Sequence, residues 1–348
     1  MRKIKKIIII TLIIAFSTGV IVYSDKVSES IFKSINICLE VIIPSTFIFM
    51  VLSSYILSSG LYESLFRPLY KPLQKLIKAD NHIISVFLLS LIGGYPVGFK
   101  LLKDLIAENK NYSEIVPYCA AFCYCISPSF AVTMLGIGLF RSIEAGFIIY
   151  ISNVITSLII AVFFSKTHKL AVNTTKTGID SYNGKITESI NSSVISLAKM
   201  CSVIIFFNSV ITVFECFCSE IAISIPVPLK SLLEISNILN YETVSPSTLP
   251  YISSLASVGG LCVVFQCKSL IEDSFSLNSF FISRVFAAII SFITTKVIMI
   301  FCDISVPSSY SGTQSYIFNF NTNKGATLFL LIMCIILMQK SEKNLKKG

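Results

Sequence analysis

The sequence predicts an all-α polytopic membrane protein, and three observations support this fold class. Hydrophobic residues make up 54% of the 348 residues and charged residues only 14%, whereas soluble proteins usually have about 25% charged residues. Apolar runs near the length of about 20 residues that a membrane-spanning helix requires recur along the chain. Most of the 28 Lys and Arg residues flank these runs, as expected of a topology signal. Soluble enzymes, nucleic-acid-binding proteins and disulfide-rich secreted proteins are therefore excluded.

The N-terminal third begins with an apolar run at residues 7–24 that follows a cluster of lysines and one arginine. No clear small-residue cleavage site follows the run, so we expect an uncleaved span with a cytosolic N-terminus. A second span is predicted at 35–59. Between 65 and 78, leucines alternate with Arg67 and three lysines, which predicts an amphipathic helix on the cytosolic interface.

Residues 83–92 are apolar but too few to span a bilayer. They lead into the sequence Gly-Gly-Tyr-Pro at 93–96 and then into a segment with Lys100, Lys103 and Asp104. This pattern predicts a re-entrant hairpin that enters and leaves from the cytosolic side. Bent backbone at membrane depth is tolerated only where protein or a polar cavity satisfies its N–H and C=O groups.

The next span, 114–139, is interrupted at Ser127-Pro128-Ser129, because proline removes a backbone donor and disfavours helical geometry at the residue before it. We therefore predict a broken helix. Residues 143–165 return to the cytosol, and the polar stretch 166–190 forms the main internal loop.

The second half repeats this order. A span at 194–218 is followed by a short apolar segment at 229–240, by a span at 248–267 that is interrupted at 257–260, and by a span at 279–302. The span count gives the two units opposite orientations, which predicts inverted repeats. The predicted parts are an N-terminal span and interfacial segment (1–34), repeat 1 (35–165), a cytosolic loop (166–190), repeat 2 (191–302), and an outer loop with a C-terminal span at about 326–338 (303–348).

Inverted repeats with discontinuous helices are typical of transporters whose binding site lies near the midplane at the repeat interface. The N-termini of half-helices expose N–H groups and suit carboxylates. We expect a substrate site where the hairpin tips, the breaks and the polar residues of the spans converge. Its candidate residues are Gly93, Gly94, Tyr95, Pro96, Ser127, Pro128, Ser129, Lys199, Glu234, Ser236, Asn237, Ser257, Gly259 and Gly260. The alternative is that these glycines and prolines only kink packed helices.

Ionisable residues inside spans are costly and usually face a cavity or a partner. Lys199 is expected either to pair with a substrate carboxylate or to extend to the interface, and Arg284 to anchor its span at the interface. Glu234 is expected either to couple transport to H⁺ or Na⁺ or to cap the second hairpin. No catalytic or metal site is predicted, because the chain has neither metalloprotease nor serine-hydrolase motifs and its cysteines fall mostly in apolar runs.

The motifs resemble those of the sporulation integral membrane protein YlbJ family, in order and over nearly the whole chain. They are Gly93 to Lys100, Cys119 to Cys123 with Ser127 to Phe130, Leu233 to Ser236, and Ser257 to Leu261. The resemblance implies a nucleoside-recognition or Gate domain with a plan similar to concentrative nucleoside transporters. It also implies a role in the mother cell, where such proteins are held to move dipicolinate (pyridine-2,6-dicarboxylate) across the outer forespore membrane.

Three functions remain open at this point. A carrier of a small organic anion needs the polar tips and Glu234, whereas a non-transporting scaffold for cortex or envelope assembly does not. A nucleoside-type carrier is the third. The expected partners are the lipid bilayer and a small organic anion, without nucleic acid or a resident cofactor, and a homo-oligomer is compatible with the sequence.

Overall fold

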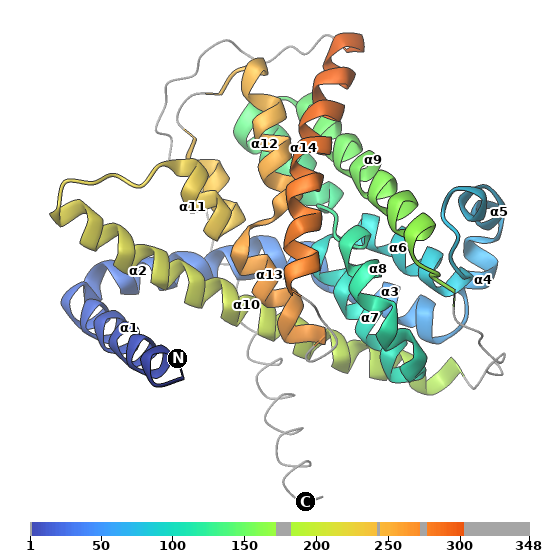
Figure 1. Ribbon diagram of the computed structural model, residues 1–348, viewed down its shortest axis with the longest axis horizontal. Coiled ribbons are helices and arrows are strands. Elements are labelled where there is room, and N and C mark those ends of the chain that lie inside the picture. The colour runs from blue at the N-terminus through green and yellow to red at the C-terminus, as the bar shows by residue number, and fades with distance from the viewer. Residues whose placement is uncertain (1, 172–181, 242–243, 272–276, 303–348) are drawn as a thin grey trace, which may run out of the picture.

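The computed structural model describes residues 2–171, 182–241, 244–271 and 277–302. These residues fold into helices and short helical turns, without a β-strand among them; one isolated bridge joins Ala79 to Leu170. The helices surround a core in which segments far apart in the sequence lie side by side (Figure 1). The predicted all-α class is therefore confirmed for the described residues.

The N-terminal helices form a bent pair. Helix α1 (Arg2–Val22) meets α2 (Ser24–Ile37) at an angle of 92°, and a π-helical turn, η1 (Cys38–Ile42), carries α2 into α3 (Ile43–Ser58). The predicted separate span at 35–59 is thus the end of a longer helical stretch that begins at Ser24. Both α2 and α3 pack along α10 (Tyr182–Glu220).

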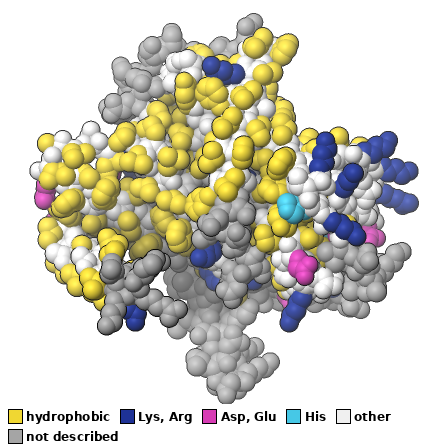
Figure 2. Space-filling view, viewed as in Figure 1, with side chains coloured by type: hydrophobic (Ala, Val, Ile, Leu, Met, Phe, Trp, Pro, Cys, Tyr) yellow, Lys and Arg dark blue, Asp and Glu magenta, His cyan; other side chains and the backbone are white. Residues whose placement is uncertain are grey.

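The predicted amphipathic segment after α3 is helical, as α4 (Tyr62–Leu65) and α5 (Arg67–Leu76). Its Lys and Arg side chains are exposed, and a group of basic side chains gathers where α4 and α5 lie (Figure 2). Its tyrosines point inward, since Tyr70 donates to the carbonyl oxygen of Tyr62 at 2.7 Å and its hydroxyl is 2.9 Å from Ser85 Oγ. The segment therefore presents a basic face outward and a polar-aromatic face inward.

His82 lies under this segment, at the base of the next helix, with its ring against Tyr62. Burial lowers the pKa of His82 below its ordinary value of 6.5, although Asp80 and Glu63 oppose the shift. A histidine with a lowered pKa binds fewer protons in the folded state than in the unfolded state, so stability falls as the pH drops through 6.5.

We therefore expect the melting temperature of the purified protein to fall between about pH 7 and pH 5. The His82→Gln variant should lose part of this dependence, and His168→Gln serves as the control. Equal pH profiles for parent and His82→Gln would contradict the assignment.

Hairpin 1 consists of α6 (Asn81–Gly93), Gly94 and α7 (Tyr95–Glu108). The Asp80 side chain caps the start of α6 by accepting from the backbone N–H of Ile83 at 2.9 Å. Gly94 has a φ of +84°, which glycine adopts without strain, and Pro96 stands in the first turn of α7, where proline is tolerated. The predicted break in the helix at 93–96 is confirmed, while the re-entrant course of the hairpin stays a prediction.

The first broken span follows. After the short turn η2 (Lys110–Glu114) come α8 (Val116–Phe122), non-helical backbone at 123–127 and the π-helical η3 (Phe130–Phe140). We call residues 123–127 the first break. Helix α9 (Ile143–Thr167) then begins at a Ser142 cap, where Ser142 Oγ accepts from the N–H of Ala145 at 3.2 Å. The predicted interruption before Pro128 is confirmed.

The second half also contains a short helical segment and a broken pair of helices before its last helix, while the inverted-repeat plan stays a prediction. Helix α10 starts at Tyr182, so the predicted loop at 166–190 is too long at its C-terminal end: the polar residues there form the first turns of a helix that becomes apolar later. The remaining elements are α11 (Val227–Leu233), η4 (Ile235–Asn240), η5 (Pro246–Thr248), α12 (Leu249–Val258), α13 (Gly260–Ile271) and α14 (Leu277–Phe301). We call α11 with η4 hairpin 2, and Gly259 the second break.

The outer faces of these helices are apolar (Figure 2). Four stretches are long and apolar enough to cross a membrane, namely 143–167, 185–220, 246–271 and 280–301, and the bent α1–α2 pair makes a fifth if it is one span. In 280–301 only 22% of the most apolar window is buried inside the protein, as expected for a helix that faces lipid. Eight spans were predicted, and not all of them are single helices long and apolar enough to cross a membrane. The predicted span at 326–338 lies outside the described residues.

The predicted topology can be tested by cysteine accessibility. Lys169→Cys should gain an impermeant maleimide label only after cells are permeabilised, because we expect the segment after α9 in the cytosol. Ser224→Cys, in the connection between α10 and α11, should gain it in intact cells. Extra label is counted relative to the parent, and labelling of Lys169→Cys in intact cells would reverse the predicted orientation.

Candidate functional site

Each hairpin tip lies against a break. A Cβ added to Gly94 of hairpin 1 would stand 2.8 Å from Cβ of Ser127, in the first break. A Cβ added to Gly260, directly after the second break, would stand 3.1 Å from the carbonyl oxygen of Ser231 and 3.3 Å from the backbone nitrogen of Ile235 in hairpin 2. Glycine therefore permits close backbone contact between hairpin and broken span in both halves.

The two halves meet at the C-terminal end of α12. Gly259, with a φ of +77°, ends this helix and leaves its last carbonyl groups without partners in the helix. Three consecutive carbonyl oxygens are satisfied by side chains from elsewhere: Ala256 accepts from Tyr95 Oη, Ser257 from Arg284 at 3.3 Å, and Val258 from Tyr124 Oη at 3.0 Å. Hairpin 1, the first break and α14 thus converge on one helix end.

Arg284 lies at the centre of this meeting point and is only 3% exposed. Besides Ser257, its guanidinium donates to the carbonyl oxygens of Ala121 and, at 3.4 Å, of Tyr124. In the described part of the chain the ion pairs are Lys100 with Asp104 and Lys230 with Glu215, so Arg284 has no carboxylate there. The negative ends of α8 and α12 provide its counter-charge instead.

Aromatic rings enclose the guanidinium. Its Cζ lies 4.6 Å from the ring centre of Tyr124 and 5.0 Å from that of Phe280, distances at which a cation is attracted to a ring face. The ring centres of Tyr95 and Tyr124 are 4.5 Å apart, and those of Tyr124 and Phe280 are 5.1 Å apart. The site is a buried cation among three rings, closed off by the packing of both halves.

Several predicted site residues lie at this meeting point or next to it. Tyr95 and the Ser257 carbonyl contact α12 and Arg284 as described, and Gly259 lies against the hydroxyl of Tyr124. Ser127 Oγ accepts from the backbone N–H of Phe130 at 3.2 Å and so caps the second half of the broken span. The remaining members of this group are Gly93, Gly94 and Pro96 at the hairpin 1 tip, Pro128 and Ser129 after the first break, and Gly260 after the second.

Glu234 forms a separate cluster in hairpin 2. Its buried carboxylate accepts from the backbone N–H of Ser236 at 2.9 Å and from the Ser236 hydroxyl, and its carbonyl oxygen accepts from Asn237 Nδ2 at 3.2 Å. These are the contacts of a residue that caps η4. The contacts of Glu234 are thus those of a capping residue, which was one of its two expected roles. Its role in coupling transport to an ion stays a prediction.

Lys199 lies apart from the meeting point. Its ammonium donates to the carbonyl oxygen of Ser269 at 3.3 Å, near the end of α13. Since α13 begins at Gly260, this contact is about 14 Å along the helix from the second break. The structure does not bring Lys199 together with the hairpin tips.

Sequence reasoning missed Arg284, Tyr124 and Phe280. The available signal was the arginine inside an apolar span, which is a functional candidate by default, but its place near the expected start of the span favoured an interfacial anchor. That expectation is wrong, because α8 and α12 cover this part of α14.

These features define a helical multi-pass membrane protein in which two broken helices meet at a buried arginine. No protein-family model, curated protein or solved structure matches the chain.

Proposed function

We propose that the protein is a secondary carrier of a small organic anion. One observation carries this proposal: the Arg284 cation is buried where the two halves meet and has no carboxylate partner among the described residues. Buried charges are usually paired, because desolvation of an unpaired ion is costly. When the halves separate and the carbonyl groups at the ends of α8 and α12 no longer surround Arg284, a carboxylate of the substrate would take their place.

In this proposal the two halves are inverted repeats and both hairpins are re-entrant. The matching contacts of Gly94 with the first break and of Gly260 with hairpin 2 support it. The present packing is a closed state, in which Arg284 binds backbone carbonyls. When the halves separate, the guanidinium presents its N–H fork to a carboxylate, a geometry that arginine binds in two-point fashion.

The substrate we propose is dipicolinate, carried across the outer forespore membrane during sporulation. The family resemblance supports this choice, and so does the chemistry of the site, since a planar pyridine dicarboxylate matches a cation flanked by Tyr95, Tyr124 and Phe280. A nucleoside would also stack on these rings, but it has no charge to pair with Arg284, so the anion is favoured.

Uptake into proteoliposomes tests the proposal directly. Vesicles that contain the purified protein are loaded with terbium, whose luminescence increases when dipicolinate binds it, and dipicolinate is added outside. We expect a luminescence rise that protein-free vesicles do not give and that excess uridine does not suppress. A signal equal to that of protein-free vesicles would favour the scaffold function, and suppression by uridine would favour the nucleoside-type carrier.

The same assay tests the role of Glu234. Glu234→Gln keeps the shape of the side chain and removes its charge, so uptake should lose its dependence on pH if Glu234 is the group that couples transport to H⁺. Lys199→Met is the matched control, because it also removes one charge but lies at the far end of α13. If uptake by Glu234→Gln depended on pH in the same way as uptake by the parent, Glu234 would only cap η4.

A further inference from the structure

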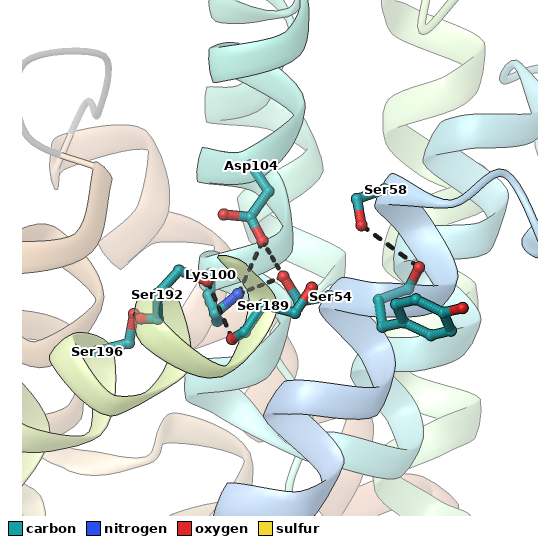
Figure 3. A network of polar contacts seen from close by, with 8 residues as sticks. Ser54, Ser58, Lys100, Asp104, Ser189, Ser192 and Ser196 are labelled. Atoms are coloured by element: carbon teal, nitrogen blue, oxygen red, sulfur yellow. Dashed lines mark hydrogen bonds and ion pairs between the residues drawn. The ribbon is translucent and has the colours of Figure 1, made fainter. Parts of the chain in front are cut away.

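A second buried cation lies in the outgoing arm of hairpin 1, away from Arg284. Lys100 on α7 is 1% exposed, and its ammonium donates to Asp104 Oδ2 at 2.8 Å and to Ser54 Oγ at 2.5 Å. The Ser54 hydroxyl in turn donates to the same Asp104 oxygen at 2.7 Å. The three groups close a triangle that joins α7 to α3 (Figure 3).

Further serine hydroxyl groups lie on the neighbouring face of α10. Besides the two bonded oxygens, buried Ser189 on α10 faces the pair (Figure 3). Ser193 is four residues further along α10, on the same face, and its buried hydroxyl has no hydrogen-bond partner in the structure. A carboxylate with several hydroxyl oxygens is the ligand set that a small hard cation prefers.

No other described cationic side chain pairs with Asp104. Lys185 on α10 donates to the carbonyl oxygen of Ser58 at 2.5 Å, and Lys103 and Glu108 lie on α7 without an ion pair between described residues. Asp104 is 24% exposed at its side chain, so the pair is buried on the ammonium side and reachable from solvent on the carboxylate side.

We propose that Asp104, Ser54 and the facing serines of α10 form a monovalent-cation site that the protein fills with its own Lys100 ammonium. The tethered ammonium holds α7 of hairpin 1 on α3, as a bound sodium ion would. If the protein is the carrier proposed above, hairpin 1 therefore requires no sodium, and uptake by the parent should be equal in sodium and in choline.

The test removes the tethered cation and asks whether a free one replaces it. Lys100→Ala leaves the space of a lysine side chain beside Asp104, and sodium that binds there should stabilise the folded state. We expect the melting temperature of purified Lys100→Ala to be at least about 2 °C higher in sodium chloride than in choline chloride at the same ionic strength. Methylammonium chloride should also stabilise it, because methylammonium resembles the missing end of the side chain.

Three comparisons isolate the site. The parent and Lys103→Ala, which lies one turn away on the same helix, should melt equally in sodium and choline. The double variant Lys100→Ala, Asp104→Asn should lose the sodium effect, because the carboxylate is gone. In uptake, Lys100→Ala should become sodium-dependent.

The proposal is overturned if Lys100→Ala melts equally in all three salts, or if sodium stabilises the double variant equally. It is also overturned if Lys100→Ala folds in none of the salts while the double variant folds, because a vacant cation site would accept a substitute. Melting requires no transported substrate, so these outcomes do not depend on whether dipicolinate is carried.

Discussion

Replacement of Arg284 by methionine should abolish anion uptake, and replacement by lysine should reduce it by about 10- to 100-fold. The lysine variant keeps the positive charge but loses the planar fork of donors. Hydrogen bonds to charged groups contribute about 1.5–3 kcal/mol, and each 1.4 kcal/mol corresponds to a factor of about ten in affinity. The loss should therefore appear as a higher dipicolinate concentration for half-maximal uptake.

Arg284 also holds the carbonyl oxygens of Ala121, Tyr124 and Ser257, so the methionine variant is expected to melt at a lower temperature. The lysine variant separates binding from folding, because it can still donate to these carbonyls. Lys296→Met is the matched control, since Lys296 lies exposed on the same helix. If the Arg284→Lys variant reached half-maximal uptake at the same dipicolinate concentration as the parent, Arg284 would have no role in anion binding.

Gly98→Ala should be the most destabilising single methyl addition in hairpin 1. The new Cβ would stand closer than 3.0 Å to the backbone carbonyl oxygen of Cys123 and also to Cβ of Ser90. Backbone atoms cannot rotate away, so α7 must move off the first break. Overpacking of this kind costs about 1–3 kcal/mol, which for a chain of 348 residues corresponds to a melting temperature lower by about 1–4 °C.

Gly138→Ala is the control for this change. The atom nearest to its new Cβ, the carbonyl oxygen of Thr133, would be 3.3 Å away, so a shift of a few tenths of an ångström suffices. Thermal unfolding of both variants in detergent, followed by light scattering, compares them. Equal melting temperatures would show that hairpin 1 and the first break are not tightly packed in the folded protein.

Local features of the structure were predictable because local residues determine them. The reversal at Gly93 and Gly94, the interruption before Pro128 and the amphipathic helix from Arg67 follow from glycine and proline geometry and from charge periodicity. The end of α12 at Gly259 belongs to the same group. Each of these depends on residues within about one or two helical turns.

The contacts that build the candidate site were not predictable in this way. Arg284 and the carbonyl oxygen of Ala121 are separated by 163 residues, and hydropathy does not tell which helices cover a given arginine. Lys199 shows the converse, because this charge inside a span was expected either at the site or at the interface and contacts the carbonyl oxygen of Ser269. The helical stretch from Ser24 to Ser58 begins before the predicted span at 35–59, because helical structure continues through the change from polar to apolar sequence.

Four hydrogen bonds act as a latch between the two halves: Tyr95 and Tyr124 donate to the carbonyl oxygens of Ala256 and Val258, and Arg284 donates to those of Ala121 and Tyr124. Since Arg284 on α14 is itself bound to the carbonyl oxygen of Ser257 on α12, movement of the α12 end and α14 away from the first half breaks all four bonds together. A partly opened latch would leave buried carbonyl groups unsatisfied, which is costly. In the proposed carrier, opening is therefore expected to be an all-or-none event, in which the halves exchange between discrete arrangements instead of moving gradually apart.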